Sequence, residues 1–395
     1  MAYLHHTRKL LNFSVALSVL LNVSTAFVSS HIGSRQVPSS SLPMADKDSS
    51  AHTPPTTVVI AGAGVIGTAT AYYLAKDFGI KSILVDPSGE VAPAASGKAG
   101  GFLALDWNDY SPVGPLTRRS FALHQELADT FGAEKIQYRR LTCTSIAVGS
   151  NDNRRPSGKK LEGIEWAEAS SIVGVRPLGG EETIAQVHPK KLCQAFFEAT
   201  KELVPETQLV QGKIASAVYD DSDKVGKTIV GAKLEDGTTL AGDALLYSCG
   251  PWTPGNVMMG VKYHSLVVPT DKVLSQCVFF SGCGDPEVYV RPDSTAYCTG
   301  FPDPPTVVTE EPGQEEVRKD AIAKIQKAVE QASSASSFQF ESSSSPPSEK
   351  QLQNACYLPT PLDGIPIMGR LDDKGHSYIA AGHTCWGILS KCRFS

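Results

Sequence analysis

Residues 57–67 read TVVIAGAGVIG. The first half is a short apolar run rich in β-branched residues, which predicts a buried strand. The second half is G-x-G-x-x-G, built from Gly62, Gly64 and Gly67, and Ala, Leu and Tyr recur at helical spacing in Thr68–Lys76. In such a strand–turn–helix unit the first glycine permits the tight turn. The second lets a pyrophosphate approach the backbone, and the third lets the helix pack against the strand.

The start of the predicted helix and the next strand complete a dinucleotide-binding unit. A helix N-terminus offers free N–H groups to phosphates, so we expect Val65 and Ile66 to contribute to the site. The second predicted strand, Ser82–Val85, leads to Asp86, and 86 minus 62 places this acid 24 residues after Gly62. The offset is close to the roughly 20 residues expected of the acid that binds ribose hydroxyls. An acid there fits FAD or NAD and disfavours a 2′-phosphate. The alternative is a glycine-rich turn in another α/β protein.

Composition narrows the class of protein. The 395 residues are enough for two domains or one large one, and 41% hydrophobic with 19% charged residues is typical of a globular chain. The net charge of −5 is spread without a basic stripe, so we expect a small-molecule substrate and no nucleic-acid partner. Nine cysteines without a C-x-x-C pair predict neither a disulfide framework nor a metal site. Free thiols are the simpler interpretation.

The N-terminal residues 1–55 have the composition of a targeting leader. No acidic residue occurs in residues 1–45, and two basic residues precede the apolar stretch Leu10–Ala26, as in a signal peptide. This stretch is too short and interrupted to span a membrane, so we expect no transmembrane anchor in the mature chain. The Ser-rich residues 27–55 have the composition of a transit peptide. The signal-like and transit-like segments together are similar to the two-part leaders of complex algal plastid proteins, which favours a location in the plastid. The alternative is a disordered tail before a cytoplasmic protein that begins at Met44.

The rest of the chain predicts an α/β fold with an interleaved order. Alternating segments at Val261–Phe280 and Val288–Tyr297 indicate a second, more antiparallel sheet. We therefore expect a discontinuous Rossmann-like FAD-binding domain with an inserted mixed or antiparallel substrate domain. The expected boundaries are 56–255 for the major part of the FAD-binding domain, 256–350 for the substrate domain with a Ser-rich insertion at 333–348, and 351–395 for the return to the FAD-binding domain.

Three further motifs narrow the cofactor. They are SGKAGGF at Ser96–Phe102, CGPWT at Cys249–Thr253, and AGHTCWGI at Ala381–Ile388, which follows DGIPIMG at Asp363–Gly369. Together they resemble the D-amino-acid-oxidase-like superfamily of FAD-dependent oxidoreductases, which includes glycine and sarcosine oxidases. The resemblance covers about Thr56–Leu389. It is greatest to a branch of unassigned substrate that carries S-G-K-A-G-G-F-L-A and G-H-x-C-W-G-I-L.

The resemblance implies a non-covalent FAD cofactor. By that resemblance Gly382–Ile388 runs along the flavin ring, Lys98–Gly101 sits at the pyrophosphate and isoalloxazine, and the backbone of Ile214 faces the adenine. The further predicted FAD-binding residues are Ser96, Lys98, Ala99, Gly100, Gly101, Ile214, Gly250, Trp252, Gly382, His383, Gly387 and Ile388.

The implied reaction is oxidation of a small molecule at a C–N or C–O bond, with hydride transfer to flavin N5. Two alternatives are a flavin-binding or flavin-less interaction protein that has lost redox activity, and an NAD-dependent dehydrogenase. Amino-acid-oxidising relatives carry an Arg-Pro pair whose Arg binds the substrate carboxylate, whereas Leu358-Pro359 stands here. Relatives also continue into a helix under the FAD where this sequence ends at Ser390–Ser395. Either the sequence is truncated or the cofactor is less enclosed.

Two residues are candidates for catalysis. His383 could lie beside the flavin pyrimidine, where a positive charge would stabilise reduced anionic flavin, or it could simply pack against a backbone carbonyl. Arg291 could bind an anionic substrate from the second sheet, or pair at the surface. Lys98 could contact phosphate or, through water, flavin N5, or be solvated. We expect no covalent flavin attachment through Cys249, Cys356 or Cys385.

Overall fold

The computed structural model describes residues 55–149, 164, 166–167, 172–220, 222, 228–255, 257–333, 337–341, 351–371 and 376–391. The expected leader lies outside the described residues except for Pro55. The expected Ser-rich insertion at 333–348 is described only at 333 and 337–341. Among the helices in these ranges, none has the length and apolarity needed to cross a membrane.

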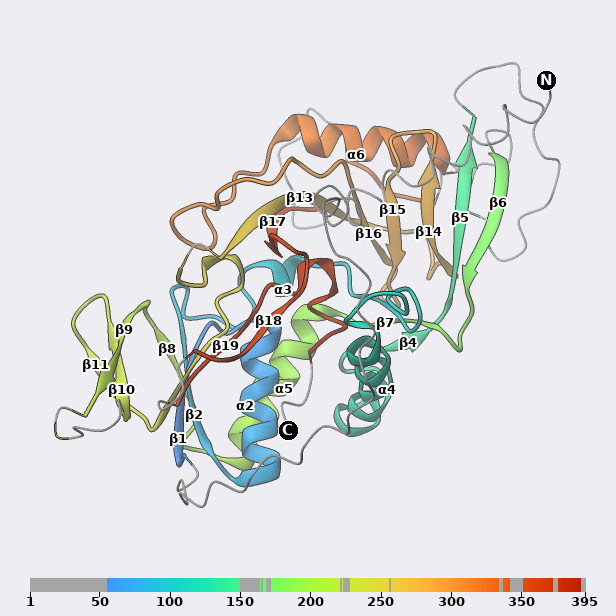
Figure 1. Cartoon of the computed structure of the whole chain (residues 1–395). Helices are drawn as coiled ribbons and strands as arrows, with labels where there is room; N and C mark the ends of the chain where they lie inside the picture. The colour runs from blue at the N-terminus through green and yellow to red at the C-terminus, as the bar shows by residue number, and fades with distance from the viewer. Residues whose placement is uncertain are drawn as a thin grey trace, which may run out of the picture.

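A six-stranded sheet forms the nucleotide-binding half, with the order β18-β19-β12-β1-β2-β8 (Figure 1). All neighbours are parallel except the edge strand β18, which runs antiparallel to β19. In chain order its strands are β1 (Thr57–Ala61), β2 (Lys81–Asp86), β8 (Gln208–Gln211), β12 (Ala244–Tyr247), β18 (Ile367–Arg370) and β19 (Ser377–Ala381).

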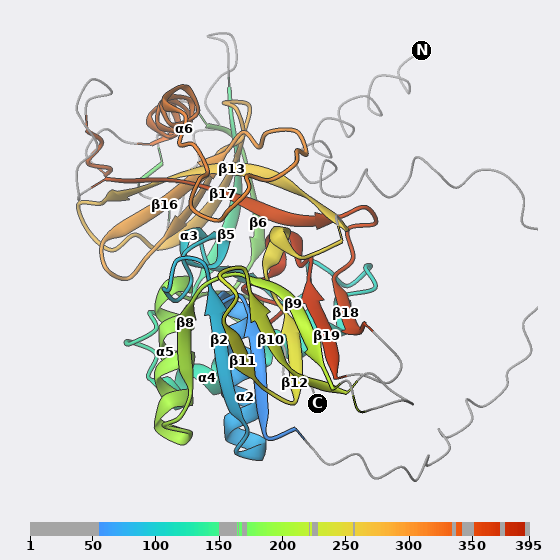
Figure 2. The same cartoon turned by 90° about the vertical axis from the view of Figure 1, so that its left-hand side faces the viewer.

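Both faces of this sheet are covered, which explains the apolar character of β1. Val58 and Ile60 share a core with one face's helices, while Val59 packs with a three-stranded sheet on the other face. Figure 2 shows that small sheet lying against the strands. The covering elements are helices α2 (Val65–Phe78), α4 (Gly114–Phe131) and α5 (Pro189–Leu203), and strands β9 (Ile214–Tyr219), β10 (Ile229–Leu234) and β11 (Thr239–Ala241).

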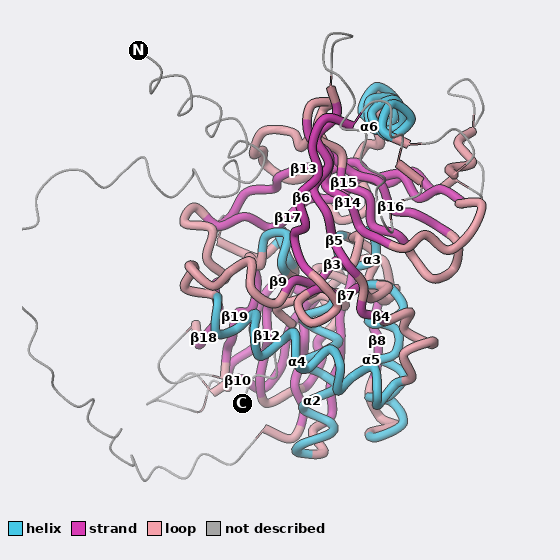
Figure 3. The backbone as a smooth tube through the Cα atoms, turned by 90° about the vertical axis from the view of Figure 1, so that its right-hand side faces the viewer, coloured by secondary structure: helices cyan, strands magenta, loops and turns pink. Residues whose placement is uncertain are grey.

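A seven-stranded sheet, ordered β17-β13-β16-β15-β14-β5-β6, forms the second half. It is antiparallel except for the parallel pair β14–β5. Helix α6 (Lys319–Ala332) covers the face turned away from the first sheet (Figures 1 and 3). Its strands are β5 (Thr142–Val148), β6 (Ile172–Gly179), β13 (Met258–Pro269), β14 (Gln276–Ser281), β15 (Glu287–Val290), β16 (Thr295–Gly300) and β17 (Leu352–Pro361).

Short elements join the two halves. They are helix α3 (Ala95–Lys98), strands β3 (Phe102–Ala104), β4 (Arg139–Arg140) and β7 (Ile184–Gln186), and the single-turn helices η2 (Gly250–Trp252) and η3 (Thr384–Trp386). The architecture confirms the predicted α/β class.

The expected domain boundaries differ from the sheet membership. Strands β5 and β6 fall within 56–255 and β17 falls within 351–395, yet all three belong to the seven-stranded sheet. Strand β5 pairs with β14 through Cys143 and Cys277, 134 residues later (277 minus 143). A pairing over such a separation leaves no local pattern in the sequence, so the division by composition placed these strands in the wrong half.

Candidate cofactor and active site

A cavity lies at the carboxyl ends of four neighbouring parallel strands. Its wall includes Asp86 at the end of β2, Gly62 after β1, Ser248 after β12 and Gly382 after β19. Ligands of open α/β sheets bind at this edge. The space between the lining residues is about 1350 Å³ when it is counted out into open solvent. The lining follows the strand ends over the length of the nucleotide unit, where a dinucleotide binds in folds of this kind.

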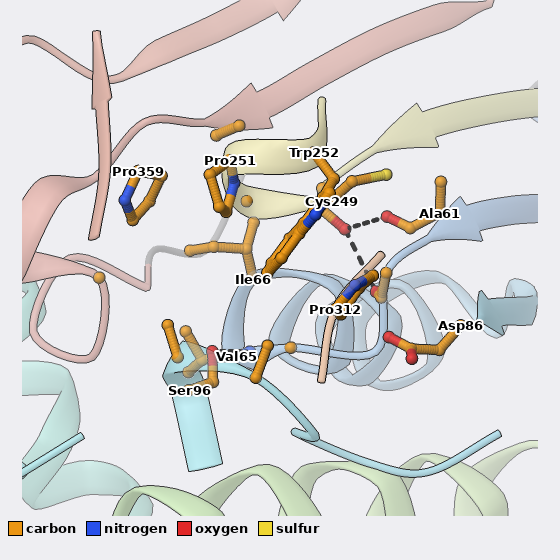
Figure 4. Close-up of a pocket in the computed structure, with 18 of the residues that line it drawn as sticks. Ala61, Val65, Ile66, Asp86, Ser96, Cys249, Pro251, Trp252, Pro312 and Pro359 are labelled. Carbon is orange, nitrogen blue, oxygen red and sulfur yellow. Dashed lines mark hydrogen bonds between the residues drawn. The ribbon is translucent and has the colours of Figure 1, made fainter. Parts of the chain in front are cut away.

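The wall extends from the nucleotide unit to the second sheet. Figure 4 shows Asp86 at one side of the cavity and Pro359, from β17, at the other. Fourteen of the predicted site residues line it: Gly62, Gly64, Val65, Ile66, Asp86, Ser96, Ala99, Ile214, Gly250, Trp252, Gly382, His383, Gly387 and Ile388. The structure brings these residues together, and their role in binding FAD stays a prediction.

The glycine turn has the close packing that the motif predicts. Gly62 has φ +95°, and a Cβ there would lie 2.6 Å from the Ser248 carbonyl oxygen. A Cβ on Gly67 would lie 2.0 Å from the Gly62 carbonyl oxygen, so only glycine lets helix α2 approach the strand this closely. Gly64 faces the cavity and caps α2 without a side-chain hydrogen bond. The helix N-terminus therefore fits a phosphate.

Asp86 is held as a fixed carboxylate in the wall. Its Oδ2 accepts a hydrogen bond of 3.1 Å from the Ala63 N–H, and its Oδ1 accepts from the Ser88 N–H at 3.1 Å and the Ser88 hydroxyl at 2.8 Å. Only 5% of Asp86 is exposed. A positioned acid at this point fits the ribose of a dinucleotide.

His383 contributes an imidazole whose nitrogens have no protein partner. The residue is 3% exposed, and neither ring nitrogen has a hydrogen-bond partner among the described residues. Burial lowers the pKa of His383 to about 4, because a charged imidazole loses hydration there. The protein alone therefore holds a neutral imidazole near neutral pH, which differs from the predicted positive charge. Two orphaned nitrogens in a cavity wall fit a ligand that supplies hydrogen-bonding atoms.

The turn after β12 closes another side of the cavity. The Ser248 hydroxyl donates to the Ala61 carbonyl oxygen at 2.8 Å and so ties β12 to β1. The Trp252 indole N–H donates to the Thr309 carbonyl oxygen at 2.8 Å, which holds the turn against the segment that contributes Pro312. No periodicity or motif in the sequence signalled that 310–312 would reach the site.

Five predicted site residues lie outside the cavity wall: Gly67, Lys98, Gly100, Gly101 and Arg291. The Lys98 ammonium donates to Glu315 Oε2 and to the Ala355 carbonyl oxygen, both at 3.1 Å. Lys98 therefore joins the two halves of the molecule. The alternative of a solvated Lys98 is wrong, because both contacts are to protein groups. Sequence reasoning missed Glu315, because no local pattern links positions 217 residues apart.

Arg291 supports the turn beneath Ala99. It is 7% exposed, its Nη2 donates to the Ala99 carbonyl oxygen at 3.4 Å, and its guanidinium lies 5.7 Å from the centre of the Tyr297 ring. The predicted contact with an anionic substrate therefore has no geometric support. Leu358, in contrast, lines the cavity at the position where the resemblance implied an Arg.

Two cysteines line the cavity, Cys249 and the exposed Cys385. Burial raises the pKa of Cys249 to about 12, so this group is a thiol, which is a weaker nucleophile than a thiolate. The expected absence of covalent attachment stays a prediction.

Comparisons with known proteins identify the family. A Schizosaccharomyces pombe protein named as an oxidoreductase is 31% identical over 362 residues, which are 84% of this chain and 90% of that protein. The crystal structure of glycine oxidase from Bacillus cereus matches with a TM-score of 0.67 at 18% identity, covering 85% of this chain and 92% of that one. That of L-proline dehydrogenase from P. horikoshii matches with a TM-score of 0.64 at 14% identity, covering 85% and 90%. The family model "FAD dependent oxidoreductase" matches residues 57–392. The chain belongs to the DAO family of FAD-dependent oxidoreductases.

Proposed function

We propose that this enzyme oxidises a C–N bond of a small amine substrate with FAD. The observation that carries the proposal is a single cavity that is lined both by the strand ends of the nucleotide unit and by β17 of the second sheet, so that cofactor and substrate would share it. The solved structures with the same fold include a glycine oxidase and an L-proline dehydrogenase, whose substrates both carry a C–N bond.

The residues present fit FAD. The backbone at Gly64 and the N-terminus of α2 would hold the pyrophosphate, and Asp86 would hold the ribose. When bound, FAD supplies the hydride acceptor. The chain itself positions the substrate and excludes water. Gly382–Ile388 would cover the flavin, with His383 contributing a buried imidazole to this part of the wall.

The substrate that fits lacks a clamped α-carboxylate. A bidentate clamp needs a guanidinium, and Leu358 offers only apolar surface to the cavity. Arg291 does not take over, because it is bound beneath Ala99. We therefore expect an amine or imino compound to be oxidised in preference to a simple α-amino acid.

Flavin spectroscopy tests the proposal. Purified protein is incubated with FAD, desalted and scanned in the visible, where oxidised flavin absorbs. Amines are then added without oxygen and bleaching is followed. Retained FAD that one of the amines bleaches supports the proposal. A colourless protein after desalting, or retained flavin that no amine in a broad panel reduces, would refute it.

A further inference from the structure

One face of the seven-stranded sheet is turned toward the nucleotide unit and carries a carboxylate among aromatic rings. Glu287 and Tyr289 lie on the same side of β15, because side chains alternate along a strand. Glu287 pairs with Phe279 of β14, and Tyr289 pairs with Tyr297 of β16. A Cβ on Gly100 would lie 2.1 Å from the Tyr289 ring, so this face packs against the motif Ser96–Phe102.

The rings form a connected aromatic cluster beside the cavity. The Tyr289 ring stacks on Phe102 with centroids 5.3 Å apart and lies 5.8 Å from Phe279. Trp107 contacts Phe102 at 5.1 Å and Trp386 at 6.4 Å. Trp386 belongs to η3, whose Thr384 and Cys385 line the cavity. Phe102, Phe279 and both tryptophans remain partly exposed although they lie between the two halves. We call these residues, together with Tyr289, the aromatic cluster.

Glu287 lies close to the cavity wall through its partner Tyr289. The Tyr289 hydroxyl donates to Glu287 Oε2, and the Tyr289 ring packs on Gly100, the neighbour of the wall residue Ala99. Tyr263 of β13 lies on the same face of the sheet, because it is two residues from Ser265, and Thr299 of β16 pairs with both Ser265 and Glu287. At the far end of the cluster, Trp386 is the neighbour of Cys385, which also lines the cavity.

This carboxylate has no cationic partner. The Tyr289 hydroxyl donates to Glu287 Oε2. Burial raises the pKa of Glu287, and no lysine, arginine or histidine among the described residues counteracts this effect. A partly buried carboxylate without a counter-charge is unfavourable, and either a proton or a bound cation neutralises it. Aromatic faces around it add attraction for a cation.

We propose that Glu287, with the rings of Tyr263 and the aromatic cluster, binds a cationic nitrogen of the substrate. The inference rests on the proposed function and narrows it, since the substrate becomes an amine that binds as a cation and carries no α-carboxylate. The bound cation gives up an N–H proton to the Glu287 carboxylate before its carbon loses hydride, because the nitrogen needs its lone pair to form the imine product. Leu358 agrees with this class, because the cavity offers no guanidinium there to attract an anion.

A matched pair of ligands tests the inference by binding. Choline carries a trimethylammonium group, and its isostere with carbon in place of nitrogen has the same shape without charge. FAD-loaded protein is titrated with each, and with methylammonium and trimethylammonium. Tryptophan fluorescence reports on the four tryptophans together, of which Trp107 and Trp386 belong to the aromatic cluster and Trp252 lines the cavity, and flavin absorption reports on the cavity. We expect the best-binding cation to bind at least about tenfold tighter than its neutral counterpart, as for a charged hydrogen bond.

Three variants assign the preference to the carboxylate. Glu287→Gln keeps the size of the side chain and should lose the cation preference, whereas Glu287→Asp keeps the charge and should retain part of it. Glu330→Gln is the control, because it removes the same charge from exposed α6 on the far face of the sheet. An unchanged preference in Glu287→Gln, or no preference for any cation in the wild type, would overturn the inference.

The same experiment separates this inference from the proposed function. Loss of FAD on desalting refutes the proposed function. Retained FAD that an amine reduces, without any cation preference, refutes only the role of Glu287.

Discussion

Replacing His383 should make the FAD-free protein less sensitive to acid. His383 is buried in the cavity wall without a protein partner for either ring nitrogen among the described residues. Its pKa falls from 6.5 to about 4 because burial disfavours the charged imidazole. The unfolded chain takes up a proton near pH 6.5, whereas the folded chain does so only near pH 4. Stability therefore falls as the pH drops through this window.

The size of the effect follows from the two pKa values. At about 1.4 kcal/mol per pH unit, the limiting loss below pH 4 is about 3.4 kcal/mol. At pH 5 the unfolded state is almost fully protonated at this site and the folded state is not, so the loss relative to pH 7.5 is about 2 kcal/mol. His383 is almost completely shielded from solvent, so water does not screen the effect strongly.

Urea denaturation at pH 7.5, 6.5, 5.5 and 5.0 measures this difference. His383→Leu removes the titrating group, and its free energy of unfolding should fall about 2 kcal/mol less than that of the wild type between the first and last pH. His188→Asn is the matched control. Burial also lowers the pKa of His188 to about 4, but His188 lies outside the cavity wall. Asn can keep its role as the N-cap of α5.

Saturating FAD separates the two histidines. A ligand that offers hydrogen-bond acceptors to His383 stabilises the charged imidazole, raises its pKa toward 6.5 and so shrinks the difference between wild type and His383→Leu. The His188 contribution should not change, because the ligand does not reach it. Parallel pH curves for wild type and His383→Leu without FAD would refute the reasoning. So would an effect of FAD on both histidines alike.

Three other predictions concern the cofactor, the join between the halves and the substrate. Gly64→Val places methyl groups in the cavity and should abolish FAD retention after desalting, whereas Gly174→Val, whose Cβ lies 3.6 Å from Ala147 Cβ, should retain it. Glu315→Gln removes the buried anion that binds Lys98 and should lower the free energy of unfolding by about 1–3 kcal/mol; Glu235→Gln at the exposed pair with Lys213 should leave urea denaturation unchanged. Glycine, sarcosine, D-alanine and D-proline should bleach the flavin of the wild type poorly, and robust turnover of these acids would contradict this. Leu358→Arg should increase bleaching by the same acids about tenfold or more, whereas the control Leu362→Arg, at a position that is 80% exposed, should not.

The nucleotide-binding unit could be predicted from the sequence because its determinants are close together along the chain. The strand, glycine turn and helix at 57–78 interact over a few residues, and each glycine has a backbone reason to be there. The acid at Asp86 follows one strand later. Such short-range patterns predicted the fold class and five residues of the cavity wall, Gly62, Gly64, Val65, Ile66 and Asp86, whereas the family resemblance added the other nine.

The contacts between the two halves of the molecule could not be predicted from the sequence. Lys98 meets Glu315 across 217 residues, and β5 pairs with β14 although composition placed them in different domains. Arg291 looked like a free cation at a strand end, yet the fold places it beneath Ala99. These contacts depend on how two sheets face each other, and a single sequence does not encode that arrangement in any local spacing.

This contrast explains why the cofactor is identified more sharply than the substrate. Backbone atoms at strand ends contact a dinucleotide, so glycines at fixed positions mark its site in the sequence. In the function proposed above, side chains on one face of an antiparallel sheet contact the substrate, and they come from strands far apart along the chain. Glu287, Leu358 and Tyr263 stand on three different strands of that sheet. The substrate must therefore be inferred from what this face presents, which is the apolar Leu358 where the resemblance implied a guanidinium, and the carboxylate of Glu287 on another strand.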